Sequence, residues 1–310
     1  MRRAVVVLAA LVAALLPVVD AAPAGAETAD PLPVPYQFLP SAILGGMPDA
    51  DAPGTNDWTC KPTAAHPRPV VLVHGTAGNR STNWQTYGPL LKNNGYCVFA
   101  LTYGVPPGTS YPASAFGGMN DIASSAHELG AFVDKVLAAT GAGKVDIVGH
   151  SQGTLMPDYY AKFLGGARRI HDYVSLAPLW HGTGLGDVQP LLAAAFGDAA
   201  NQPTPYCVAC GQMSTSSDFM ASMRAGGVAV PGIRYTNIVT RYDELVQPYT
   251  SGIEPGMTNI VLQDLCPTDF TEHFEIAADR NASILVLNAL DPAHPRPLVC
   301  SVVLPFVGGA

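Results

Sequence analysis

The chain has 310 residues, of which 48% are hydrophobic and 13% are charged, and its formal net charge is −8. This composition excludes a disordered chain, because disordered chains contain too few apolar residues to bury a core. No run of Lys and Arg follows the first residues, so nucleic acid is not expected as a partner.

The N-terminus has the pattern of a secretory signal peptide. Arg2 and Arg3 precede an apolar run over residues 4–16, and the small residues 24–26 supply a cleavage site. The run is too short to cross a bilayer, although an uncleaved N-terminal anchor is the alternative. We therefore expect a signal peptide over residues 1–26 and a secreted, extracellular protein. Residues 27–310 have the length of one large domain.

The first half of the mature chain alternates between predicted strands and helices. Residues 27–69 are rich in Pro and Gly and predict an extended segment. Residues 69–73 predict a buried strand, residues 83–94 a helix and residues 96–103 a second strand. Residues 119–140 predict an amphipathic helix, because apolar residues recur at steps of three and four. Its apolar positions are Ile122, Ala126, Leu129, Val133 and Val136.

The second half continues the same alternation around one interruption. Strands are predicted over residues 144–148, 171–176, 233–240 and 259–262, and a helix over residues 282–290. Alternating strands and helices predict an α/β fold with a mostly parallel, doubly wound sheet.

Residues 178–231 interrupt the alternation and have weak periodicity, which predicts an insertion into the domain. Several of its apolar side chains suit a binding site for an apolar chain, although most could simply pack the insertion onto the domain. They are Leu179, Leu185, Leu191, Leu192, Phe196, Met213, Met220 and Met223.

The sequence Gly149-His150-Ser151-Gln152-Gly153 follows a predicted buried strand and precedes a segment that can form a helix. Strand, tight turn, serine and helix are the context of a nucleophile elbow. A Cβ atom at either glycine would clash with neighbouring backbone, and the helix N-terminus favours developing negative charge. We expect Ser151 to be a catalytic nucleophile.

A nucleophilic serine needs a base, and the base needs an acid that orients it. Of the eight histidines, His273 follows the last predicted strand, where a loop can carry it over Ser151. Asp243 is the first carboxylate after the strand at residues 233–240. The order Ser151, Asp243, His273 is that of an α/β-hydrolase. Glu244 is the alternative acid, and Asp264 and Asp269 are weaker ones.

Acyl transfer also requires donors for a negatively charged tetrahedral oxygen. Thr76 lies in the turn after the strand at residues 69–73, and Gln152 follows the nucleophile directly. Their main-chain amides are the predicted oxyanion donors. Gly75 leaves room for close approach, although His74-Gly75 is also a plausible strand-ending turn.

Six cysteines remain after export, and an even number in an exported protein favours disulfides. Their spacing alone leaves the pairing open. Cys207 and Cys210 could instead form half of a zinc site, but no second pair completes four ligands. We expect no metal.

On these motifs the chain resembles the secreted class 2 lipases of actinobacterial type, and it is also similar to the fungal lipase B group. The resemblance extends over residues 60–300 and is most specific in the loop Asp243-Glu244-Leu245-Val246-Gln247-Pro248. It implies the α/β-hydrolase fold, hydrolysis of triglycerides or other carboxylesters, and a further donor in the Thr76 hydroxyl. It also implies the disulfides Cys60–Cys97 and Cys266–Cys300, which leaves Cys207–Cys210 as a local bridge. Thr154 departs from the family, in which a second glycine is common.

The expected protein is thus a secreted serine carboxylester hydrolase, foremost a triacylglycerol lipase. It needs no cofactor, acts on lipid or small ester substrates as a monomer, and makes at most transient contact with a lipid interface. Two alternatives are an acyltransferase with the same catalytic residues and a non-catalytic secreted binding protein.

Overall fold

A parallel sheet lies at the centre of the computed structural model, which describes residues 30–45, 50–184 and 207–309. Within these ranges six strands pair in the order β2-β1-β3-β4-β5-β6, and every pairing is parallel. The doubly wound parallel sheet predicted from the sequence is confirmed. The strands are β1 Val70–Val73, β2 Val98–Leu101, β3 Val145–His150, β4 Ile170–Leu176, β5 Arg234–Val239 and β6 Thr258–Val261.

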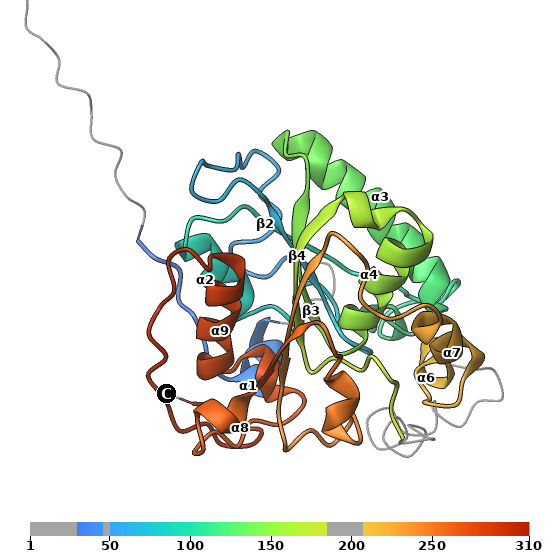
Figure 1. Cartoon of the computed structure of the whole chain (residues 1–310). Coiled ribbons are helices and arrows are strands. Elements are labelled where there is room, and N and C mark those ends of the chain that lie inside the picture. Colours follow the sequence, from blue (N-terminus) through green and yellow to red (C-terminus); the bar gives the residue numbers. More distant parts are fainter. Residues whose placement is uncertain (1–29, 46–49, 185–206, 310) are drawn as a thin grey trace, which may run out of the picture. The chain divides into compact units, whose positions relative to one another are not determined.

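Helices cover both faces of the sheet (Figure 1). On one face α3 (Ile122–Thr140) and α4 (Gln152–Phe163) pack on Val71 and Val73 of β1. On the other face α2 (Tyr87–Asn93) and α9 (Arg280–Leu290) enclose Val70 and Leu72. Successive residues of a strand point to opposite faces, so the apolar run of β1 supplies both cores.

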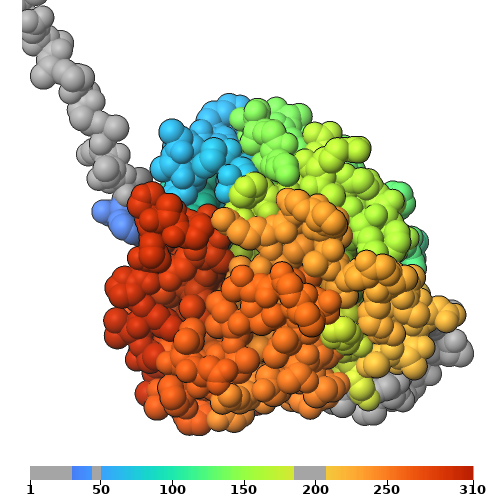
Figure 2. Space-filling model, viewed as in Figure 1, coloured from blue at the N-terminus to red at the C-terminus, as the bar shows by residue number. Residues whose placement is uncertain are grey.

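Shorter elements connect this framework. The remaining helices are α1 Phe38–Gly45, α6 Val208–Gln212, α7 Asp218–Arg224 and α8 Leu262–Leu265, with 3₁₀ turns at η1 Ala113–Ala115, η2 Gly166–Arg168, η4 Tyr249–Gly252 and η5 Glu275–Ala277. Seen from the same side, the segments that follow β5 form much of the surface (Figure 2). No helix of the described ranges is both long and apolar enough to span a bilayer.

Two predicted helices begin later than their sequence pattern indicates, because side chains cap the preceding turn. The side chain of Asp121 accepts a hydrogen bond from Ser124 N (2.7 Å), so α3 begins at Ile122 rather than at residue 119. The side chain of Asn79 binds the main-chain N–H groups of Ser81 and Thr82. These bonds stabilise the turn at residues 79–82 at the start of the predicted helix, and α2 begins only at Tyr87.

The prediction of an extended segment over residues 27–69 is wrong for residues 38–45, which form α1. The N–H of Phe38, its first residue, donates to Oε2 of Glu275 (3.0 Å). A carboxyl oxygen at a helix N-terminus satisfies an otherwise unpaired N–H donor, and burial raises the pKa of Glu275 to about 8. That partner lies 237 residues away in sequence, so local periodicity could not reveal this helix.

The predicted insertion is described only in part. Residues 207–231 contain the short helices α6 and α7, and Met220 and Met223 of α7 are buried. Leu179 and Met213 are also buried. Leu185, Leu191, Leu192 and Phe196 lie outside the described residues, as does the predicted signal peptide.

All six cysteines form disulfides. The bonded pairs are Cys60–Cys97, Cys207–Cys210 and Cys266–Cys300, the pairs implied by the resemblance. The zinc alternative for Cys207 and Cys210 is wrong in this structure, because their sulfur atoms are bonded to each other. Cys60–Cys97 ties the segment before β1 to the segment before β2.

The side chain of Asp158, in α4, is fully buried. Its Oδ1 accepts a hydrogen bond from the Tyr235 hydroxyl (2.6 Å), while its Oδ2 has no partner among the described residues. Burial disfavours the charged form and raises the pKa of Asp158 to about 7, against the smaller, opposite effect of the Tyr235 hydrogen bond.

The pKa of Asp158 predicts a stability that falls with rising pH. The folded state binds the Asp158 proton more tightly than the unfolded state does. Protonation of Asp158 therefore contributes fully to the free energy of unfolding below about pH 4, and this contribution is lost as pH rises through about 7. Asp158 should lower the free energy of unfolding of the wild type by about 2–3 kcal/mol between pH 5 and 8, and Asp158→Asn should lack this part of the decrease. Chemical denaturation at several pH values measures this slope.

Asp134→Asn is the matched control, because Asp134 lies on the neighbouring helix α3 with its side chain 64% exposed. It should leave the pH slope unchanged. An equal slope in wild type and Asp158→Asn would show that Asp158 is already ionised in the folded protein.

Candidate active site

Ser151 lies between β3 and α4 in a strained turn. Its backbone angles are φ 55° and ψ −125°, a conformation that residues with a Cβ rarely adopt. A Cβ at Gly149 would lie 2.2 Å from the carbonyl oxygen of Gly153, and one at Gly153 would lie 2.0 Å from that of Val73. Both glycines are therefore required for the turn, as the elbow motif predicts.

The structure brings Ser151, His273 and Asp243 into one hydrogen-bonded chain. His273 Nε2 lies 2.9 Å from Ser151 Oγ, and His273 Nδ1 lies 2.9 Å from both carboxylate oxygens of Asp243. His273 is 2% exposed and Asp243 3%. This is the geometry in which an imidazole can take a hydroxyl proton while a carboxylate fixes its tautomer.

The Asp243 carboxylate is fixed by its own loop. Its Oδ1 accepts hydrogen bonds from the main-chain N–H groups of Leu245 (2.9 Å) and Val246 (2.7 Å). These bonds hold the carboxylate in the orientation in which it faces His273 and prevent it from rotating away.

The other carboxylates considered from the sequence have different partners. Glu244 Oε2 accepts a hydrogen bond from the main-chain N–H of His273 (3.1 Å) and does not contact the ring nitrogens. Asp264 is exposed and pairs with Arg241, while Asp269 is buried and binds Asn281 Nδ2 (2.8 Å). Only Asp243 among them reaches the imidazole of His273.

Opposing effects set the pKa of His273. Burial disfavours the charged imidazolium, but the adjacent Asp243 carboxylate, with smaller contributions from Glu244 and Glu272, outweighs burial and raises the pKa above its ordinary value. The site therefore stabilises the imidazolium that forms when His273 accepts a proton.

Thr76 and Gln152, the residues that carry the predicted oxyanion donors, are in contact through their side chains. The Thr76 hydroxyl donates to Gln152 Oε1 (3.2 Å), and a Cβ at Gly75 would lie 3.0 Å from Ser151 Cβ. Gln152 is fully buried, and its Nε2 has no partner among the described residues. The loop after β1 thus approaches Ser151 closely at Gly75.

A cavity of about 400 Å³ opens beside Ser151 and His273. Its wall is mostly apolar and comes from distant parts of the chain. Residues of α1, the end of η1, the insertion and the loops that carry Asp243 and His273 contribute: Phe38, Ala42, Ile43, Phe116, Leu179, Cys210, Met213, Leu245, Val246 and Phe274. The insertion therefore supplies cavity wall in its described part, whereas sequence reasoning missed the contribution of α1.

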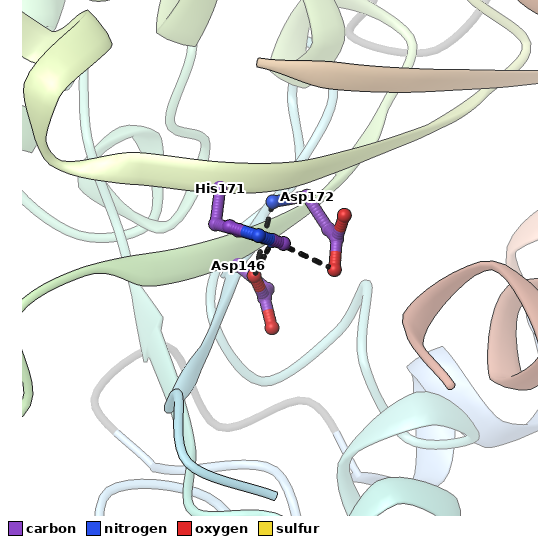
Figure 3. A group of neighbouring side chains, drawn as sticks. All are labelled: Asp146, His171 and Asp172. Atoms are coloured by element: carbon purple, nitrogen blue, oxygen red, sulfur yellow. Dashed lines mark hydrogen bonds and ion pairs between the residues drawn. The ribbon is translucent and has the colours of Figure 1, made fainter. Parts of the chain in front are cut away.

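A second group of polar side chains lies at the opposite, amino-terminal ends of the strands (Figure 3). Asp146 of β3 and His171 and Asp172 of β4 have ligand atoms within 4.8 Å of one another. Arg68 bridges the two carboxylates, at 2.7 Å from Asp146 and 3.1 Å from Asp172, and Arg234 lies 2.5 Å from Asp172. Two guanidinium groups already neutralise these carboxylates, so the cluster is an ion-pair network and offers no vacant metal site.

Comparison with known proteins identifies the family to which the chain belongs. A family model described as "Lipase (class 2)" matches residues 67–285. Triacylglycerol lipases of Pseudarthrobacter phenanthrenivorans and Burkholderia plantarii are each 36% identical over 103 residues, which is 32% of this chain. The match spans 29% and 26% of those two proteins, respectively.

Solved structures show the same fold. Aspergillus fumigatus lipase B superposes with a TM-score of 0.59 at 20% identity, covering 80% of this chain and 57% of that one. The mature form of Bacillus licheniformis lipase BlEst2 superposes with a TM-score of 0.53 at 18% identity, covering 74% and 94%.

The strained turn predicts an order of stability among variants of Ser151. Ser151→Gly and Ser151→Ala both remove the hydroxyl, but only glycine adopts positive φ without steric cost. We expect Ser151→Gly to be more stable than Ser151→Ala by about 1 kcal/mol in denaturant titrations. An alanine variant as stable as the glycine variant would show that the turn stores no strain at this residue.

Proposed function

Because the chain belongs to the class 2 lipase family, we propose that it is a carboxylester hydrolase, foremost a triacylglycerol lipase, with Ser151, His273 and Asp243 as its catalytic residues. The observation that carries the proposal is the pair of 2.9 Å contacts that His273 makes, through Nε2 with Ser151 Oγ and through Nδ1 with Asp243. The names of the two relatives, both triacylglycerol lipases, support the choice of substrate.

The proposed reaction begins when Ser151 Oγ attacks the ester carbonyl carbon and His273 Nε2 takes the hydroxyl proton. Asp243 stabilises the resulting imidazolium, and the main-chain amides of Thr76 and Gln152 bind the tetrahedral oxyanion. The C–O bond then breaks, and the alcohol leaves with the proton from His273. Water, activated by the same imidazole, hydrolyses the acyl-enzyme and regenerates Ser151.

Two further observations support the proposed substrate and the proposed extracellular location. The apolar wall of the cavity suits an acyl chain, because ester recognition needs polar contacts only at the reacting carbonyl. Three disulfides and the apolar N-terminal run suit an oxidising, extracellular environment. We propose a secreted monomer whose residues 27–310 form one hydrolase domain, with residues 178–231 as an insertion at the substrate site.

A direct test uses the purified protein with p-nitrophenyl esters of increasing acyl length and with emulsified triglyceride. We expect release of p-nitrophenol and fatty acid, and labelling of Ser151 by a fluorophosphonate probe. Ser151→Ala should lose turnover by a factor on the order of 10⁶ and should not be labelled. A wild-type protein that neither hydrolyses any ester nor reacts with the probe would overturn the proposal.

The two neighbouring carboxylates of the acid loop should differ sharply in their effect on activity. Asp243→Asn removes the acceptor that selects the Nδ1–H tautomer of His273, and turnover should fall roughly 10⁴-fold. Glu244→Gln keeps an oxygen that can accept from His273 N, so its effect should be mild. Steady-state kinetics of both variants measure this difference, and the reverse order would identify Glu244 as the acid.

A further inference from the structure

His150, the residue before the nucleophile, makes a contact that the proposed reaction does not use. It is the last residue of β3 and only 3% exposed. Its Nε2 lies 2.8 Å from the main-chain carbonyl oxygen of His273, and its Nδ1 lies 3.2 Å from the side-chain oxygen Oδ1 of Asn83. The two imidazole rings are 5.1 Å apart between centroids, so the contact is with the main chain of His273 and leaves the catalytic ring free.

The position of the single proton on His150 follows from its partners. Burial lowers the pKa of His150 to about 3, and the nearby His273 acts in the same direction, so the ring is neutral and carries one proton. Both ring nitrogens face oxygen acceptors, and a neutral ring can donate to only one of them. The shorter contact, 2.8 Å to the His273 carbonyl oxygen against 3.2 Å to Asn83 Oδ1, places the proton on Nε2. Asn83 Oδ1 accepts a hydrogen bond from the main-chain N–H of Gly75 (3.3 Å) instead.

The other polar group of the same main chain is bound as well. The N–H of His273 donates to Glu244 Oε2 (3.1 Å), from the acid loop. His273 lies in a turn and not in a strand or helix, so no regular secondary structure fixes its backbone. Two side chains bind the main chain of His273 instead. His150, at the end of β3, contacts its carbonyl oxygen, and Glu244, in the loop after β5, accepts from its N–H.

We propose that His150 is a positioning residue that fixes the His273 main chain by donating a hydrogen bond from Nε2 to the His273 carbonyl oxygen. With the main chain fixed, only two side-chain torsions place Nε2 of His273 over Ser151 Oγ, and the bond of Nδ1 to Asp243 restricts both. Loss of the carbonyl bond lets the turn shift. A displacement on the order of 1 Å at a reacting group can lower turnover about 100-fold. This inference rests on the proposed hydrolase function.

Two substitutions separate this role from simple filling of space. In His150→Gln the amide nitrogen lies near the position of Nε2 and can still donate to the carbonyl. In His150→Asn the shorter amide reaches only the position of Nδ1, which retains the contact with Asn83 and loses that with His273. We expect kcat for a soluble p-nitrophenyl ester to stay within about 3-fold of wild type for Gln and to fall about 10–100-fold for Asn, with similar KM values.

The pH profile gives a readout that packing alone would not change. The charged and titratable groups that face His273 are Asp243, Glu244, Glu272 and His150 itself. The Asp243 carboxylate raises the pKa of His273, so an imidazole displaced from Asp243 should have a lower pKa. The acid limb of kcat/KM should therefore move to lower pH in His150→Asn and remain in place in His150→Gln. Equal kcat values and equal acid limbs in the two variants would overturn the inference.

Nitrogen NMR of the intact wild-type protein, with labelled histidine, tests the proton position directly and remains informative if both variants fail to fold. The expected spectrum shows His150 neutral with its proton on Nε2, and a proton on Nδ1 would overturn the proposal. Wild-type inactivity toward esters would instead overturn the proposed function, so the two failures are distinguishable.

Discussion

The close contact between the Gly153 main chain and the carbonyl oxygen of Val73 is the constraint on which the site depends. A single added Cβ atom there would meet that oxygen at 2.0 Å, so only glycine lets the first turn of α4 lie against the end of β1. Because of this close approach, the chain reverses its direction at Ser151. The loop after β1, which carries Thr76, also comes to lie beside the start of α4. It also leaves His150 below the turn, in contact with the loop that carries His273.

The sequence predicts the framework well where the signal is local. The apolar runs of the strands and the period of α3 identify the parallel sheet, and the elbow motif identifies Ser151. Geometry is needed where adjacent residues of the same type differ in role. Asp243 and Glu244 both follow β5, yet one binds the imidazole of His273 and the other its main-chain N–H. Contacts that are distant in sequence, such as that of Glu275 with α1 and that of His150 with His273, leave no local pattern.

Carboxylates serve different purposes at the two ends of the sheet. At the amino-terminal ends, arginines neutralise Asp146 and Asp172. At the carboxyl-terminal ends, carboxylates bind main-chain N–H groups: Glu272 binds those of Phe274 (2.6 Å) and Glu275 (3.1 Å), and burial raises its pKa to about 7. The second arrangement orders the turn around His273. When these groups are ionised, they also add negative potential beside the imidazole of His273, which favours its positively charged form.

The attachment of α1 to Glu275 sets the order in which the substrate site can be assembled. The wall formed by Phe38, Ala42 and Ile43 belongs to an early part of the chain, but the carboxyl group that binds the first residue of α1 lies 237 residues later. The six strands and the turn at Ser151 are all made before that carboxyl group, whereas the cavity wall can be completed only after it. A growing chain can thus contain the paired strands and the turn at Ser151 while the cavity beside them still lacks one of its walls.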